Sequence, residues 1–220
     1  MDNSADISPE MIVIPTGYFP SVSNGNSRYA GKEVVSFELA KYTVTNQLWQ
    51  SVMDFIPDSK FNKSLDLPVV NVSWFDVQSF LENLNKQTNN QYRLPTELEW
   101  EYAARAGSVG DYYFPRKNIY HSNGQKNVVN YDKKRNGTVE VGSLPPNPWG
   151  LYEMLGNVWE WVSDEGGHLY PYMLGEHDTG LMKGGCWASG NEHIKLGSRE
   201  EHERNMEGWD TFGFRIARDL

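Results

Sequence analysis

Three stretches of the chain carry apolar side chains at helical spacing, and each follows a residue that can cap a helix. Thr45, Ser73 and Thr96 are those caps, and Glu99 completes a capping box with Thr96. The first two predicted apolar faces are formed by Leu48, Trp49, Val52 and Phe55, and by Phe75, Val77, Phe80, Leu81 and Leu84. The pattern therefore predicts three helices, the last of them ending near Gly107.

The other apolar runs are short and rich in β-branched and aromatic residues, which is typical of strands. We expect strands within 11–20, 34–44, 137–144, 156–164, 181–189 and 213–220. After Ser108 helical periodicity is weak, and Gly, Asn, Pro and Tyr are frequent. No linker or internal repeat divides the chain. We predict a disordered tail over residues 1–10 and one α+β domain over 11–220 with little regular secondary structure.

The segment GLYEMLGNVWEW places a carboxylate, Glu160, between two indoles. Trp159 and Trp161 flank it at strand spacing, after a Gly-Asn turn. A carboxylate shielded from water needs a metal ion, an arginine or backbone N–H groups as its partner. Arg199 and Arg215 are the candidate arginines. The sequence predicts that Glu160 faces inward, and it leaves the choice of partner open.

Composition narrows the classes of partner. The 220 residues carry a net charge of −9, which argues against nucleic acid, and the one basic run, 133–135, reads as a solvated loop. No apolar stretch is long enough to span a membrane, and the acidic N-terminus does not resemble a signal peptide. We therefore expect a cytoplasmic protein or the mature or truncated form of an exported one. Cys186 is the only cysteine, so an intramolecular disulfide is excluded.

Several of these segments, taken together, resemble a known family. RLPTELEWEYAARAG, NPWGLYEMLGNVWEWVSD, KGGCW and FGFRIAR are similar in order and spacing to signature blocks of the formylglycine-generating enzyme (sulfatase-modifying factor) family. KYTVTNQLW and LPVVNVSWFDV resemble its earlier blocks. The resemblance implies a variant of the C-type lectin fold. It implies no single function, because the family includes copper oxidases, non-heme iron enzymes and ligand-binding proteins diversified by retroelements.

The positions that carry catalysis in this family differ here. Aligned on the KGGCW motif, the two copper-binding cysteines fall on Ser189 and Ile194, which cannot supply thiolates to Cu(I). The iron enzymes place two histidines on the helix that matches PTELEWEYAAR, and that helix has none. We expect neither copper nor iron. The alternative is a metal-dependent oxidase or oxygenase with an unfamiliar ligand set, drawn from His121, His168, His177, His193 and His202.

The resemblance also implies a calcium site. Its ligands would be the carboxylates of Glu153 and Glu160 and the carbonyls of Gly156 and Val158, a mixture of oxygens that suits Ca²⁺. A second family site would use Asn130 and the Tyr131 carbonyl, but the acidic half of that site is replaced by a basic turn. For Glu160, calcium and an arginine partner remain equal alternatives.

The segment between the KGGCW and GFR motifs is polar, charged and without apolar periodicity. In the retroelement-diversified branch this is the variable, ligand-binding region, and loops on a rigid scaffold commonly carry recognition residues. We predict a non-catalytic module that binds a protein or a small ligand. The candidate contact residues are Trp187, Ser189, Asn191, His193, Lys195, Arg199, Glu201, Trp209 and Asp210. The acidic residues of this segment would favour a partner with a basic patch.

Overall fold

The computed structural model describes residues 7–22, 28–115, 129–131, 136–165, 178–205 and 209–220. Three helices, α1 (Asn46–Met53), α2 (Trp74–Thr88) and α3 (Glu97–Arg105), begin directly after the predicted caps. Thr96 and Glu99 form the expected capping box, and Ser73 and Asp76 form a second one. The cap side chains accept hydrogen bonds from backbone N–H groups that the first helical turn leaves unpaired, which explains why local sequence located these helices.

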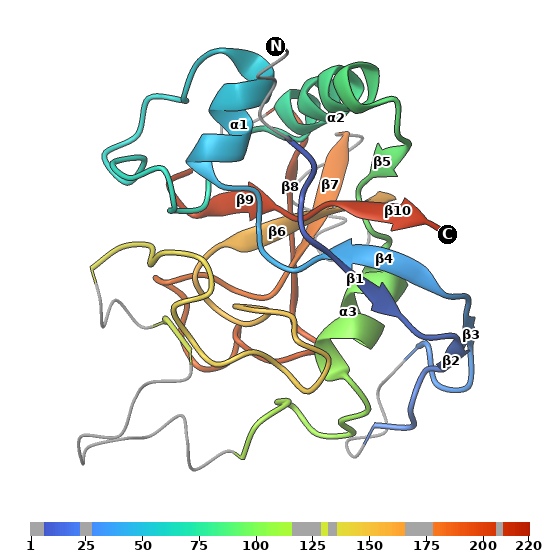
Figure 1. Cartoon of the computed structure of the whole chain (residues 1–220). Coiled ribbons are helices and arrows are strands. Elements are labelled where there is room, and N and C mark those ends of the chain that lie inside the picture. The colour runs from blue at the N-terminus through green and yellow to red at the C-terminus, as the bar shows by residue number, and fades with distance from the viewer. Residues whose placement is uncertain (1–6, 23–27, 116–128, 132–135, 166–177, 206–208) are drawn as a thin grey trace.

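The strands form three sheets (Figure 1). The first has the order β1-β4-β10-β5, and all its neighbouring strands are antiparallel. Its strands are Met11–Ile14, Phe37–Ala40, Ala217–Asp219 and Tyr92–Arg93. A small hairpin pairs β2 (Gly17–Tyr18) with β3 (Glu33–Val34).

The third sheet has the order β8-β7-β6-β9. Its strands are Arg199–Glu203, Thr179–Lys183, Trp159–Glu165 and Phe212–Phe214. β6 and β9 run parallel, and the other pairs are antiparallel. The predicted last strand thus divides between two sheets, because the chain leaves β9 and enters β10 across Arg215 and Ile216.

Two clusters of buried apolar residues fill the interior. One lies around α3 and β4, with Trp100 and Leu39 wholly buried, and the other joins α1 and α2 to the β6–β9 sheet. In the view of Figure 1, α1 and α2 lie together at the top and α3 lies beneath β4. The described residues 136–158, drawn mainly in yellow, contain no named helix or strand and lie in the lower left half of that view. This arrangement is an α+β fold with few helices, as predicted.

Several local expectations were wrong. Residues 137–144 form no strand, because side chains rather than a neighbouring strand bind their backbone: Asn157 bonds Val139, and Glu153 bonds Gly142 and Leu144. The first helix ends at Met53, so Phe55 lies beyond it and is half exposed, as is Phe75. The third ends at Arg105, near Gly107 as predicted, although Ala106 rather than Gly107 is its left-handed C-cap.

Residues 7–10, predicted to belong to a disordered tail, make contacts with the domain. Ile7 packs against the second apolar cluster, and the Glu10 carbonyl accepts a hydrogen bond from the Lys41 N–H. Residues 1–6 lie outside the described residues. Within the described part of the chain, no helix has the length and apolar character that crossing a membrane requires.

Candidate functional site

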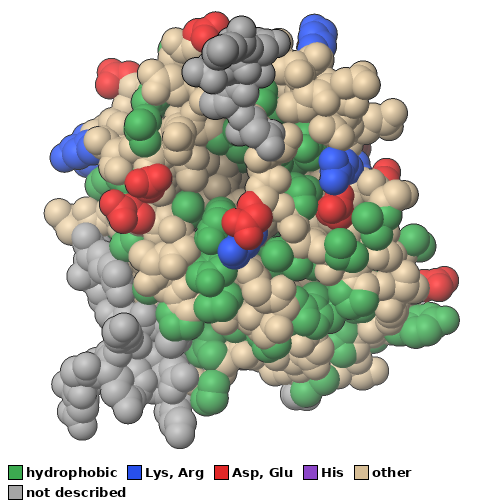
Figure 2. Space-filling model, viewed as in Figure 1, with side chains coloured by type: hydrophobic (Ala, Val, Ile, Leu, Met, Phe, Trp, Pro, Cys, Tyr) green, Lys and Arg blue, Asp and Glu red, His purple; other side chains and the backbone are tan. Residues whose placement is uncertain are grey.

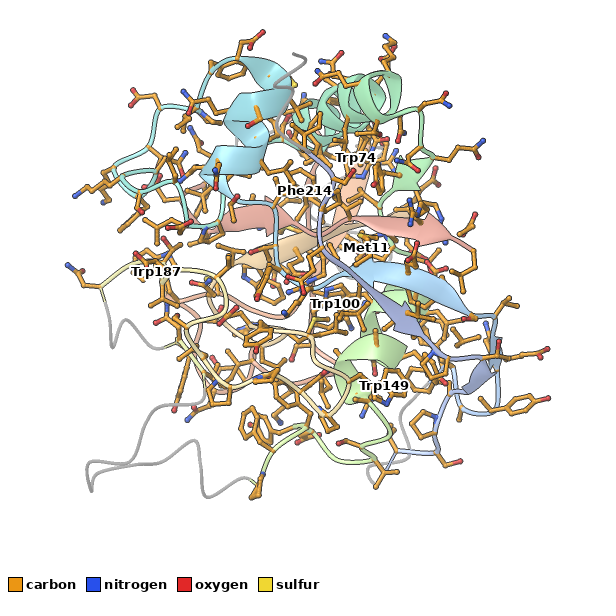
Figure 3. All side chains as sticks on the ribbon, in the orientation of Figure 1. Met11, Trp74, Trp100, Trp149, Trp187 and Phe214 are labelled. Atoms are coloured by element: carbon orange, nitrogen blue, oxygen red, sulfur yellow. The ribbon has the colours of Figure 1, made fainter. Side chains whose placement is uncertain are left out.

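Glu160 is buried on β6, and its partner is an arginine. The Arg215 guanidinium reaches both carboxylate oxygens, with Nη2 3.0 Å from Oε1 and Nε 3.1 Å from Oε2. The Trp100 indole donates a further hydrogen bond to Oε2 at 2.6 Å. In Figure 3, Trp100 lies near the centre of the molecule, above α3. Of the two predicted arginines, Arg215 is therefore the partner and Arg199 is not.

The other donors of Arg215 are also used. Its Nη1 donates to the carbonyls of Ala40 and Lys41, and its Nη2 donates to that of Tyr152 at 2.7 Å. Arg215 is wholly buried, and it joins the end of β4 to β6 and to the segment before β6. Every one of these contacts is internal to the protein, so the pair holds the two four-stranded sheets together and presents nothing to a ligand.

Glu153, the other carboxylate of the calcium set, also has internal partners. Its two oxygens accept hydrogen bonds from the Gly142 and Leu144 N–H groups, both at 2.9 Å. Burial raises the pKa of Glu153 above its usual value, which disfavours its charged form. The oxygens of both carboxylates therefore accept hydrogen bonds from internal donors and need no calcium ion to satisfy them, and calcium binding by this set stays a prediction. Gly156 is required for another reason: a Cβ there would lie 2.3 Å from the Asn130 carbonyl oxygen.

The second calcium set is described only in part. Asn130 is buried and donates to the Gly137 carbonyl, while its own Oδ1 has no hydrogen-bond partner among the described residues. Residues 132–135, which would complete this set, lie outside the described residues, so that site stays a prediction. Within the described ranges, no three His, Cys, Asp or Glu side chains are grouped as metal ligands. Of the five histidines, only His193 and His202 fall in those ranges.

The two positions that align with the copper-binding cysteines are parts of the interior. Ser189 is buried; its hydroxyl accepts from the Cys186 N–H at 2.9 Å and lies 3.3 Å from Cys186 Sγ. Ile194 is wholly buried in the first apolar cluster. Burial raises the pKa of the Cys186 thiol, which keeps this single sulfur in its neutral form.

Five of the nine predicted contact residues line two cavities that share no residue. Trp187, Trp209 and Asp210 line an open cavity of about 540 Å³, which we call the aromatic hollow. Its other lining residues are Lys60, Phe61, Asn71, Ala188 and Thr211. Lys195 and Arg199 line a different cavity of about 310 Å³, which we call the charged cavity.

Aromatic rings form the walls of the aromatic hollow. Trp187, at the left of Figure 3, packs against Phe61 with ring centroids 5.0 Å apart. Trp209 is 60% exposed and lies parallel to Phe212 at 6.3 Å. Asp210 is held at the rim, since its carbonyl accepts from the Trp187 indole and its carboxylate from Ser59. The hollow thus offers exposed indole surface beside a fixed carboxylate.

Four predicted contact residues lie in neither cavity. Ser189 and Glu201 are buried, so the expectation that they would be displayed at the surface was wrong: Ser189 turns toward Cys186, and Glu201 is the inward residue of β8. Asn191 and His193 lie outside both linings. Lys60, Phe61 and Asn71 were missed because they come from a distant loop whose sequence shows no sign that it approaches the KGGCW motif.

On the face shown in Figure 2, acidic and basic side chains are interspersed among apolar ones. Charges arranged in this way cannot follow a phosphate backbone over several nucleotides. That nucleic acid is not the partner stays a prediction.

Comparisons with known proteins agree with the resemblance. Residues 1–220 match the family described as sulfatase-modifying factor enzyme 1-like domain. The inactive C-alpha-formylglycine-generating enzyme 2 of Bos taurus is 33% identical over 174 residues, which cover 73% of this chain and 53% of that protein. The chain therefore spans about half the length of this relative.

Two solved structures share the fold over nearly their whole length. Treponema denticola variable protein 1 superposes with a TM-score of 0.81 at 23% identity, covering 96% of this chain and 95% of that one. PvdO from Pseudomonas aeruginosa superposes with a TM-score of 0.75 at 27% identity, covering 98% and 96%. The fold is the predicted formylglycine-generating-enzyme variant of the C-type lectin fold.

Proposed function

Since the chain belongs to the sulfatase-modifying factor enzyme 1-like family, we propose that it is a non-catalytic module that binds a protein or small ligand in the aromatic hollow. The observation that carries this proposal is the exposure of Trp209 beside Trp187 and Phe61. Tryptophan is the residue type that most often dominates binding energy at protein interfaces. An exposed indole at the wall of a cavity offers a partner a large apolar area to cover.

The chemistry of neighbouring positions supports binding over catalysis. Cysteine ligands for copper are replaced by a buried serine and a buried isoleucine, and the remaining thiol is held neutral. The bovine relative is named as an inactive enzyme, and the variable protein from Treponema has the same fold. A scaffold that keeps its folding contacts without these reactive groups is well suited to recognition.

The rim of the hollow favours a partner with both apolar and polar groups. Lys60 packs over the Phe61 ring at 4.9 Å, so one cation borders the aromatic wall, and Asp210 contributes an anion to the lining. The segment that follows the KGGCW motif carries Glu192, Glu200 and Glu203, none of which is buried, and these would attract a basic patch on a protein partner. Association would then weaken as the salt concentration rises.

Affinity capture with matched variants tests the proposal. Immobilised wild-type protein, Trp209→Ala and Tyr18→Ala would be exposed to a lysate of the source organism. Tyr18 is 68% exposed on β2 and lies in neither cavity, so its variant controls for the loss of an exposed ring. We expect a partner held by wild type and Tyr18→Ala but not by Trp209→Ala. Equal recovery by all three, or no partner together with a bound redox metal, would contradict the proposal.

A further inference from the structure

The charged cavity lies between the first turns of α3, the Arg28–Tyr29 segment and residues 195–199. Four cationic and three anionic side chains line it: Arg28, Arg105, Lys195 and Arg199, with Glu97, Glu101 and Asp111. Mixed charges of this number are unusual in a cavity of about 310 Å³, because each charge must be desolvated in part. How these groups are paired decides what the cavity can bind.

Two carboxylates of the lining, Glu101 and Glu97, have basic partners within the protein. Glu101 accepts from Arg105 through Nε at 2.9 Å and Nη2 at 2.6 Å, and from Lys183 at 3.0 Å. Lys183 is wholly buried beneath the cavity and also lies 3.3 Å from Glu97. Burial lowers the pKa of Lys183, and the Glu101 carboxylate opposes that shift. The carboxylate oxygens of Glu101 and Glu97 therefore have little capacity left to accept hydrogen bonds from a ligand.

Glu97 is shared by more donors than any other carboxylate of the cavity. Its Oε2 accepts from Tyr29 at 2.8 Å and from Arg28, and Arg199 Nη1 lies 3.6 Å from the same oxygen. Lys183 takes the other oxygen. Three cations thus approach one carboxylate. Glu101 also pairs with Lys183, and Asp164 acts on Arg28 and Arg199 through space, but within the cavity lining Glu97 is the carboxylate that both arginines share.

Arg199 has donors that the described residues do not use. Its Nε is buried and has no hydrogen-bond partner there, and its nearest carboxylate is the one 3.6 Å away. Burial lowers the pKa of Arg199, and the neighbouring Arg28 lowers it further. Glu201 and Asp164 offset this charge through space, but neither lines the cavity. The lining consequently presents N–H donors rather than acceptors.

Lys195 adds a third cation at the opening. It is about two-fifths exposed, and its ammonium lies 3.4 Å from Asp111, a distance at the loose end of ion pairing. Its two remaining N–H donors, like those of Arg28, are accessible to solvent or to a ligand. Arg28, Lys195 and Arg199 come from two separate segments and meet at one cavity.

We propose that the charged cavity binds a small oxyanion, the carboxylate or phosphate group of a small molecule, held by Arg28, Lys195 and Arg199. Guanidinium groups match the two oxygens of such a group in a fork, and the lysine adds a point charge. The volume admits a small molecule and no polymer. The charged cavity shares no residue with the aromatic hollow, so this proposal does not depend on the function proposed above.

The test is a titration of the whole protein with two probes, inorganic phosphate and succinate, at constant ionic strength set with chloride. Side-chain NMR of the arginine Nε–Hε groups reports directly on Arg199, and calorimetry gives the dissociation constant. The Arg199→Gln variant removes the unpaired donor. Arg204→Gln is the matched control. Arg204 directly follows the same strand and its Nε is also buried without a partner among the described residues, but it pairs with Asp178 and packs over Trp74, outside the cavity.

We expect at least one probe to shift the Arg199 Nε–Hε resonance of wild type. The Arg199→Gln variant should bind that probe about tenfold more weakly or worse, as for loss of a charged hydrogen bond. Arg204→Gln should bind like wild type. Whichever probe binds identifies the head group as phosphate or carboxylate. Binding of neither probe by wild type, or equal weakening in both variants, would overturn the proposal.

Discussion

Two buried glutamates, Glu160 and Glu97, are alike in exposure and different in their surroundings. Glu160 is 1% exposed and faces one arginine, whose other donors all reach backbone carbonyls. Glu97 is 2% exposed and is approached by three cations, two of which line a cavity. The first arrangement is closed, because every donor and acceptor is used. The second is open, because donors remain at a wall that a ligand can reach.

The two glutamates show the difference between an ion pair that stabilises the fold and one whose arginine can also bind a ligand. Burial alone does not separate them, since both carboxylates are inaccessible. An unused donor beside a cavity does separate them. The donors of Arg215 have partners inside the protein, whereas the Nε of Arg199 has no partner among the described residues and Arg199 lines the charged cavity. The two pairs should therefore respond very differently to substitution.

The largest effect is expected from Arg215→Met. Removal of the guanidinium would leave Glu160 buried without its counter-ion and would take one donor from each of the Ala40, Lys41 and Tyr152 carbonyls. Breaking a buried pair in this way typically costs about 3–5 kcal/mol of unfolding free energy. Urea denaturation measures it, with Lys86→Met in the exposed Lys86–Glu82 pair as the control that should change little. If Arg215→Met lost as little unfolding free energy as Lys86→Met, the Glu160–Arg215 pair would not be the structural ion pair described above.

A much smaller effect is expected from Arg199→Gln. Arg199 has one long contact to Glu97 and lies at a cavity that water can enter, so its loss should cost about 1 kcal/mol or less. The same urea denaturation measures it. If the loss matched that of Arg215→Met, Arg199 would be a structural residue and the open character of this site would be refuted.

A pH effect should come from His202. Burial lowers its pKa below the usual 6.5, and its ring packs 4.7 Å from that of Phe212. The unfolded chain therefore binds this proton more readily than the folded one, and stability should fall as pH drops from about 6.5 toward the lowered pKa. His202→Gln should lose less unfolding free energy than wild type between pH 7.5 and 5.5. Equal losses would show that His202 does not contribute.

No effect on the melting temperature is expected when EDTA is added. Glu160 and Glu153 already have internal donors, so removal of calcium should not unpair them. Differential scanning fluorimetry with and without the chelator checks this. A decrease that occurs in wild type and is absent from Glu160→Gln would restore calcium as the partner of Glu160.

The helices of this fold were predictable because their signals are local. Thr45, Ser73 and Thr96 each bond a backbone N–H within their own first turn, so adjacent residues contain the information. Strand β8 was missed for the opposite reason. As an edge strand it buries only Glu201 among its five residues, so it shows no apolar alternation.

The candidate sites depended on contacts between distant residues. Arg215 could be proposed as the partner of Glu160, but the choice between it, Arg199 and calcium needed the crossing from β9 to β10 that brings them together. The separation of Trp209 from Arg199 could not be foreseen either. Each is completed by a different distant segment, Phe61 for one and Arg28 for the other.

Tryptophan oxidation footprinting of the protein, free and with its captured partner, tests the binding function most directly. Trp209 is 60% exposed and should be oxidised readily in the free protein. Trp149, which packs against Tyr102 and lies well apart from Trp187 in Figure 3, is the internal reference. We predict that the partner protects Trp209 and leaves Trp149 unchanged. Oxidation of Trp209 at the same rate in the complex would contradict the claim that the aromatic hollow is the contact surface.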